Sequence, residues 1–342
     1  MSRGILIGMP VGEKKLIQRI RSVARRGPSV TIGIGDDCAV LRVPQGHELL
    51  VTTDFCIENV HFRRDWHPPE VVGRRCLTRG LSDIAAMGGE PLAAFLSLAV
   101  ASDVPQKWVD RFLKGLLDLA NEFKVPLAGG DTAQSLRGIQ ADIVVIGSVP
   151  KGKAVLRSGA KPGDFIYVTG ELGGAAAALA ELELAESKRA SVRLSGHVSL
   201  SGRFSVGSSR HASKGPQPRL AVGQRLRLRG VVSAMIDVSD GLSTDLEHIC
   251  QESHVGAEIE AEAIPQALVR SGKRVGLEFA LHGGDDYELL FTSAAKIRAR
   301  VAEVRVTCIG RIMHSGGMRL IDAEGKARRL KAGGWEHFRG NL

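Results

Sequence analysis

Phe, Trp and Tyr are scarce in this chain, its cysteines show no pairing, and it has no long apolar run. The three aromatic residue types make up 4% of 342 residues, which disfavours a surface that stacks the bases of a nucleic acid. The five dispersed cysteines predict reduced thiols in a cytoplasmic protein. No segment approaches the roughly 20 apolar residues of a membrane-spanning helix, and the N-terminus MSRGILIGMPVGEKK is not typical of a secretory signal.

The positive charge of the chain is concentrated in one segment. The formal net charge is +9, but residues 187–229 hold ten of the 46 basic residues and no acidic residue. The remainder has 36 basic and 37 acidic residues, so the sequence does not predict a nucleic-acid surface built into the fold. Residues 187–216 contain nine serines and are expected to form a mobile loop, or a flap over anionic ligands.

The most informative residues that the chain does have are its aspartates, which follow apolar runs and lie beside Gly, Ser or Thr. Members of this set are Asp36, Asp37, Asp54, Asp83, Asp131, Asp237, Asp240, Asp285 and Asp286. Strand ends with Gly-rich turns are where α/β sheets place ligand sites. Because many carboxylates can share one site only if their charge is cancelled, the pattern predicts several Mg²⁺ ions and a phosphate ligand.

The order of apolar segments predicts an α/β protein with two domains. Helices are expected over 13–25, 70–87, 106–123, 173–186 and 241–253, and strands over 38–43, 48–54, 91–100, 125–128, 139–149, 165–169, 232–237, 287–292 and 304–310. A stretch rich in Pro, Gly and Lys at 150–164 indicates a boundary between domains 1–150 and 151–342.

Each motif also has a simpler interpretation when it is taken alone. GSVPKGKA at 147–154 fails the P-loop pattern because Ala154 stands where a hydroxyl would hold Mg²⁺. The pair in GIGDDC, the aspartate of LSDIAAMGG and the GGD turn could cap turns or lie on the surface, and Ser239 or Asp240 could cap a helix. The occurrence of six such motifs in one chain favours a metal cluster.

Taken in order, these motifs resemble those of the thiamine-monophosphate kinase family, which has the aminoimidazole-ribonucleotide-synthetase-like fold. The strings that carry the resemblance are GIGDDCAVL, TTDFCIENVHF, LSDIAAMGG, AGGDT, LRSGAKPGDFIYVTG, IDVSDGL, GGDDYELLF and GWEHF. The resemblance covers about 12–186 and 216–338 and implies an N-terminal mixed sheet with helices and a C-terminal α/β domain. It also implies ATP-dependent phosphorylation of thiamine monophosphate to thiamine diphosphate, by homodimers joined through their N-terminal sheets.

The resemblance implies a role for each matching residue. Mg²⁺ would be held by Asp37, Thr52, Thr53, Asp54, Asp83, Asp131, Asp237 and Asp240. ATP would contact Gly130, Asp131, Arg157 and Ser239, and thiamine monophosphate would face His61, Asp285 and Trp335. No general base is expected, because the attacking group is an already anionic phosphate oxygen. For Arg157 a solvent-facing loop position, and for Trp335 a packed anchor at the C-terminal end, remain alternatives.

The chain departs from the family pattern at two places. Asp285 stands where the family commonly has Glu, and the basic segment 187–216 replaces a shorter connection with an Arg-Pro element, matched here only by Pro218 and Arg219. Two other functions stay open: a different ATP-dependent enzyme of the same superfamily, and a non-catalytic protein that binds nucleotides or polyanions. The N-terminal 37 residues hold no Cys, which disfavours selenophosphate synthetase within that superfamily.

Overall fold

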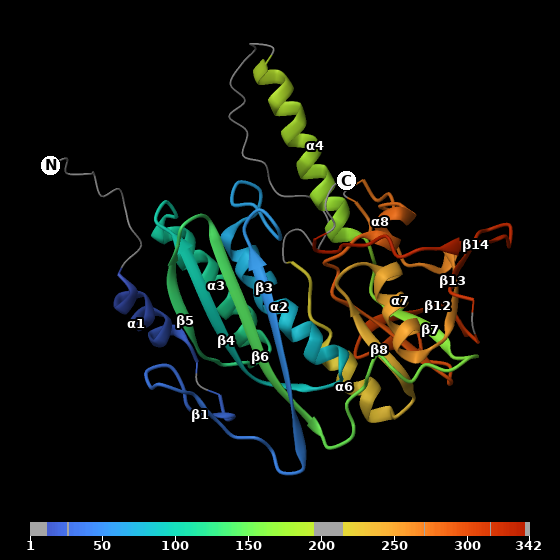
Figure 1. Ribbon diagram of the computed structural model, residues 1–342, viewed down its shortest axis with the longest axis horizontal. Helices are drawn as coiled ribbons and strands as arrows, with labels where there is room; N and C mark the ends of the chain where they lie inside the picture. The colour runs from blue at the N-terminus through green and yellow to red at the C-terminus, as the bar shows by residue number, and fades with distance from the viewer. Residues whose placement is uncertain (1–11, 26, 195–214, 270, 315, 339–342) are drawn as a thin grey trace. The chain divides into compact units, whose positions relative to one another are not determined.

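The computed structural model describes residues 12–25, 27–194, 215–269, 271–314 and 316–338, with the side chains of 188–194 excepted (Figure 1). The chain divides into two compact units. The first comprises Met1–Ile84 and Gly89–Ala154, and the second Ala85–Gly88 and Val155–Leu342. Among the described residues, none of the helices combines the length and the apolar character that a membrane span requires.

The first unit is built on a four-stranded mixed sheet with the order β3-β6-β4-β5. Its strands are β3 (His47–Ile57), β4 (Glu90–Ala101), β5 (Leu127–Ser135) and β6 (Ile139–Pro150), and a short pair, β1 (Val30–Ile32) and β2 (Val40–Leu41), precedes them. Its helices are α1 (Glu13–Val23), α2 (Pro69–Ala86) and α3 (Gln106–Glu122). Figure 1 shows α2 and α3 on one side of the sheet.

Close contact between α2 and α3 depends on two glycines. A Cβ on Gly73 would lie 1.9 Å from the carbonyl oxygen of Phe112, and one on Gly115 would lie 1.9 Å from that of Glu70. Gly80 of α2 faces the sheet, where a Cβ would lie 2.6 Å from the Val145 side chain. The helix therefore lies near enough to the sheet for a short side chain on α2 to reach one on β3.

The second unit contains an eight-stranded sheet in which β14-β13-β9-β12-β7-β10-β8 are neighbours and β11 pairs with β12. The strands are β7 (Phe165–Thr169), β8 (Val232–Val238), β9 (Gly256–Glu260), β10 (Glu288–Ser293), β11 (Arg300–Val301), β12 (Val304–Met313), β13 (Met318–Ile321) and β14 (Ala327–Leu330). The helices are α4 (Gly174–Leu194), α6 (Leu220–Arg229), α7 (Leu242–Ser253) and α8 (Leu277–His282), with a 3₁₀ turn, η1, at Ala261–Ala263. Its core is aliphatic and includes Ile166, Ile236, Leu246 and Leu290.

The predicted helices and strands are all present, with shifted ends and several additions. The strand expected over 125–128 extends to Ser135, and β3 reaches Ile57. Asp54 and Asp131 therefore lie inside strands and not at their ends, which corrects the expectation. Helix α4 continues to Leu194, into the segment predicted as a loop, and the rest of that loop, 195–214, lies outside the described residues. Helices α6 and α8, the 3₁₀ turn η1 and strands β1, β9, β11, β13 and β14 were not expected.

Candidate active site

On β3, alternate residues point to the face that α2 covers, and this places a hydroxyl and a carboxyl beside the helix. The Thr52 hydroxyl donates a hydrogen bond to the carboxylate of Asp83 on α2, and the Asp54 and Asp83 carboxyls are hydrogen-bonded to each other. Burial, and after it the neighbouring Asp83 and Asp142 carboxyls, raise the pKa of Asp54 from 3.8 to about 7 against the opposing effect of Arg79. Thr52, Asp54 and Asp83, here called the β3–α2 cluster, bring together oxygen donors of the kind that Mg²⁺ prefers.

The other face of the same sheet carries a second row of polar side chains. The Thr53 hydroxyl donates to Asp142 Oδ1 at 2.7 Å. By the strand register, Asp142 is opposite Ser97 on β4, and Ser97 is opposite Asp131 on β5. Asp131 is exposed and its own carboxylate accepts the N–H of Thr132 at 2.8 Å. Thr53 and Asp131 therefore lie on the face away from the β3–α2 cluster. Asp142 was missed, although its alternation with Ala141 and Ile143 was a signal.

The GIGDD loop and the GGD segment lie near each other in the first unit. A cavity of ≈ 120 Å³ is lined by Gly33, Ile34 and Ala128 together with Arg21 and Arg25 of the α1 region. Asp37, in the loop between β1 and β2, is exposed, and its N–H donates to Asp36 Oδ1 at 3.0 Å. Gly130 has a φ of 146°, and a Cβ there would lie 1.8 Å from the Leu96 carbonyl oxygen. Only glycine allows β5 to run this close to β4.

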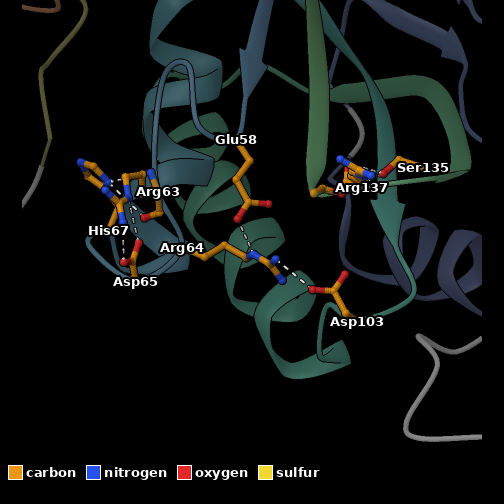
Figure 2. A network of polar contacts seen from close by, with 9 residues as sticks. Glu58, Arg63, Arg64, Asp65, His67, Asp103, Ser135 and Arg137 are labelled. Atoms are coloured by element: carbon orange, nitrogen blue, oxygen red, sulfur yellow. Dashed lines mark hydrogen bonds and ion pairs between the residues drawn. The ribbon is translucent and has the colours of Figure 1, made fainter.

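His61 lies in the loop between β3 and α2, where its side chain is held by the backbone. The Ile57 N–H donates to His61 Nδ1 at 3.0 Å, so the neutral ring carries its proton on Nε2. Phe62 is buried and its ring stacks on Trp108 with centroids 6.0 Å apart. Figure 2 shows Arg64 between Glu58 and Asp103, with ion pairs to both. These contacts fix the loop that presents His61.

In the second unit, the turn between β8 and α7 is held by a buried carboxylate that the sequence analysis missed. Asp245 Oδ2 accepts the N–H groups of Ser239, Asp240 and Gly241 at 3.1, 3.2 and 3.1 Å. Burial raises the pKa of Asp245, as do the neighbouring carboxylates Asp237 and Asp240. Oxygen and nitrogen atoms of Asp240, Asp245 and His248 lie within 4.8 Å of one another. The donor set at this turn is again suited to a divalent cation.

Two residues predicted to face the substrate meet at the same turn, although they are 50 positions apart in the chain. The Asp285 N–H donates to the Ser239 carbonyl at 2.8 Å, and the Trp335 N–H donates to the Asp240 carbonyl at 3.0 Å. Tyr287 donates from its hydroxyl to Asp285 Oδ1 at 2.7 Å. Asp285 and Tyr287 have φ values of 65° and 52°, which are rare for residues with a side chain. Trp335 is 53% exposed.

Arg157 does not join this group. The hydroxyl of Ser253, the last residue of α7, donates to the Arg157 carbonyl at 3.1 Å. Ser239 and Asp240 lie at the opposite end of the same helix, which has 12 residues and is therefore about 18 Å long. The Arg157 side chain is exposed, so its contact with ATP stays a prediction.

Two buried carboxyls and a part-buried arginine, none of which was assigned a role in the site, lie around the start of β10. Asp286 accepts the N–H groups of Gly173 at 2.6 Å and Ala175 at 3.4 Å, and burial raises its pKa to about 8. Glu288 is 1% exposed and pairs with Arg219 through two hydrogen bonds, while Thr169 donates to it at 2.5 Å. Arg219, whose role was in doubt, therefore anchors the start of α6 to the sheet.

Comparison with known proteins gives consistent results over both units. Residues 35–149 match the family model "AIR synthase related protein, N-terminal domain", and residues 161–321 match the model of the C-terminal domain. The thiamine-monophosphate kinase of Escherichia coli strain K12 is 36% identical over 345 residues, which cover 96% of this chain and 99% of the relative. That of Bacillus subtilis strain 168 is 34% identical with the same coverages.

Solved structures show the same similarity. Thiamine-monophosphate kinase from Stenotrophomonas maltophilia K279a aligns with a TM-score of 0.72 at 33% identity, covering 93% of this chain and 98% of that one. A ThiL complex with AMPPCP and TMP aligns with a TM-score of 0.70 at 29% identity, covering 96% and 97%. The hydrogenase maturation protein HypE in complex with ATP shares the fold, with a TM-score of 0.74 at 20% identity.

Proposed function

This chain belongs to the thiamine-monophosphate kinase family, and we propose that it transfers the γ-phosphoryl group of ATP to thiamine monophosphate. An oxygen of the acceptor phosphate attacks the γ-phosphorus, the bond from that phosphorus to the β–γ bridging oxygen breaks, and ADP leaves with thiamine diphosphate as the other product. The observation that carries the proposal is the near full-length similarity to kinases of this name, two of them at 36% and 34% identity.

The β3–α2 cluster and the β8–α7 turn fit the electrostatic demand of this reaction. When bound, Mg²⁺ ions would neutralise the charge between two phosphate groups that otherwise repel each other. The cluster offers a hydroxyl and two carboxyls, with Asp83 hydrogen-bonded to both Thr52 and Asp54. Burial raises the pKa of Asp54 most and the neighbouring Asp83 carboxyl adds to the rise; a divalent cation bound there would favour the ionised form. We assign metal binding to Thr52, Asp54 and Asp83, and to Asp237 and Asp240 at the turn.

The remaining predicted ligands keep their roles as parts of the proposal. Asp37 in the β1–β2 loop, and Thr53 and Asp131 on the sheet face away from the β3–α2 cluster, are proposed as further metal ligands, and Gly130, Asp131, Arg157 and Ser239 as contacts to ATP. His61 presents an Nε2–H that can donate to an anionic or carbonyl group of the substrate. Trp335 offers a half-exposed indole, which can stack on the cationic thiazolium ring. Asp285 is held by the neighbouring Ser239 carbonyl and contributes a carboxylate to substrate binding.

We further propose that the protein is a homodimer joined through the sheet of the first unit. Leu49, Val51 and Phe55 of β3 alternate along one face and are 50, 66 and 60% exposed. The register adds Ile146 beside Val51 on the same face. A patch of this kind on a sheet face typically marks an interface. We also propose a cytoplasmic location, which is supported by five cysteines that form no disulfide.

The proposal is tested by incubating the purified protein with MgATP and thiamine monophosphate and resolving the products by mass. One ADP and one thiamine diphosphate per turnover, with no product from free thiamine, are expected. Free thiamine is the matched control because it lacks only the acceptor phosphate. Intact ATP and unchanged thiamine monophosphate would contradict the proposal and direct the search to other acceptors used by enzymes of this fold.

A further inference from the structure

The segment Gly333–Trp335, near the C-terminal end of the described residues, is held at the beginning of α7 by three successive backbone amides. Gly333 N–H donates to Ser243 Oγ at 3.2 Å and Gly334 N–H to Thr244 Oγ1 at 3.1 Å. The third donor is Trp335 N–H, which reaches the Asp240 carbonyl at 3.0 Å. Ser243 and Thr244 are the second and third residues of α7. This segment, here called the tail, therefore follows the same helix turn that carries Asp240.

Both glycines of the tail are required by the closeness of this contact. A Cβ on Gly334 would lie 2.0 Å from the Asp240 carbonyl oxygen and 2.7 Å from Thr244 Oγ1. A Cβ on Gly333 would lie 2.8 Å from His282 Nδ1. No larger residue fits without moving the tail away from the helix.

The hydroxyl of Ser243 links the tail to α8. It accepts from Gly333 and lies 2.8 Å from His282 Nδ1. The other ring nitrogen of His282, Nε2, lies 3.5 Å from Glu278 Oε2. The tail is thus held by groups from two helices, and each hydroxyl in this contact is part-buried.

From this geometry we infer that Ser243, Thr244 and Gly334 are positioning residues that set the place of the Trp335 indole for binding the thiamine moiety of the substrate. The inference rests on the proposed function. Asp285 N–H and Trp335 N–H are held by the carbonyls of the adjacent residues Ser239 and Asp240. The backbones of Asp285 and Trp335, the two predicted substrate contacts, are therefore both held by the turn between β8 and α7. Loss of the tail contact displaces the indole while leaving the Asp285 support and the β3–α2 cluster in place.

The test compares Gly334→Ala, Thr244→Val and Trp335→Ala in the full chain, by measuring kcat and KM for thiamine monophosphate and for ATP. Trp335→Ala is expected to raise the KM for thiamine monophosphate about tenfold, because the variant loses one cation–π contact and the area buried with it. Gly334→Ala should approach that value, and Thr244→Val should give about a threefold to fivefold increase, as one hydrogen bond is removed. The KM for ATP should change less than about twofold in all three.

Three comparisons separate positioning from general damage. Thr244→Ser keeps the hydroxyl and should restore the wild-type KM. Gly12→Ala adds the same methyl group where no atom lies within 4 Å and should change nothing. In the double variant Gly334→Ala with Trp335→Ala, the KM should equal that of Trp335→Ala alone, because the tail acts through the indole.

Each outcome has a defined meaning. Additive effects in the double variant, or an equal rise in the KM for ATP, would overturn the inference. If Trp335→Ala leaves the KM for thiamine monophosphate unchanged, the tail positions no substrate contact and the inference is also overturned. Wild-type turnover of thiamine monophosphate is measured in the same series, so a failure of the proposed function appears separately as absence of product.

Discussion

The two units of the molecule bury carboxyl groups in different surroundings. In the first unit, Asp54 and Asp83 face each other, and the pKa of Asp54 rises to about 7 through burial and the neighbouring carboxyls. In the second unit, Asp245 accepts three backbone N–H groups and Glu288 pairs with Arg219. In the first arrangement two carboxyls face each other, with Arg79 opposing the rise in pKa, whereas in the second arrangement backbone N–H groups and the Arg219 guanidinium donate to the buried carboxylates. In the proposed function the first set binds a cation, while the hydrogen bonds of the second set hold the backbone in place.

The largest effect is expected from removing one charge of the β3–α2 cluster. Asp54→Asn should lower kcat at least a hundredfold, because a metal-binding carboxylate supplies several kcal/mol of transition-state stabilisation. Steady-state turnover of thiamine monophosphate measures it. The same variant should fold and unfold cooperatively, because Asn relieves repulsion from Asp83. Activity near the wild-type level would remove Asp54 from the metal set.

Asp54 also predicts a pH dependence of stability. In the folded protein its pKa is about 7, above the ordinary 3.8, so the folded state keeps a proton that the unfolded state releases. Stability should therefore fall as the pH rises from about 4 through 7 and stay low above that. Thermal unfolding in EDTA between pH 5 and pH 8 should show this fall in the wild type and a smaller one in Asp54→Asn.

A smaller effect, on stability alone, should follow from breaking the compensated arrangement of the second unit. Arg219→Met leaves the Glu288 carboxylate, which is 1% exposed, without its cation, at a cost of about 3–5 kcal/mol. Urea unfolding measures the change. Arg225→Met on the exposed side of α6 is the matched control and should cost less than about 0.5 kcal/mol. If the double variant with Glu288→Gln were no more stable than Arg219→Met, the buried charge would not be the cause.

The sequence predicted the fold class, the motifs and most elements, because apolar periodicity and Gly-rich turns are local signals. It could not distinguish the two kinds of carboxylate. Asp285 and Asp286 are adjacent letters, yet only the first was assigned a role, and the second accepts N–H groups of residues 113 and 111 positions away. Donors so distant leave no trace in the local pattern. Likewise, only the strand register shows that Asp131 and Asp54 lie on opposite faces of one sheet.

The smallest effect tests whether a buried carboxylate paired with an arginine also stabilises the first unit, at the loop that carries His61. The Glu58 side chain is 7% exposed and bonds to Arg64, which also pairs with Asp103, itself 64% exposed (Figure 2). Glu58 Oε2 is buried and has no hydrogen-bond partner among the described residues. Glu58→Gln keeps the shape but removes the charge, and should lower stability by about 1–2 kcal/mol.

Asp103→Asn is the control on the exposed side of the same arginine, and urea unfolding should detect no change because solvent screens that pair. The KM for thiamine monophosphate should rise about twofold to threefold in Glu58→Gln, since the loop that holds His61 loses one charged bond. Equal losses of stability in the two variants would mean that the buried Glu58–Arg64 pair stabilises the protein no more than the exposed Arg64–Asp103 pair. The loop that carries His61 would then be held by the packing of Phe62 on Trp108 and not by the Glu58–Arg64 ion pair. In that case buried ion pairs would stabilise the second unit but not the first.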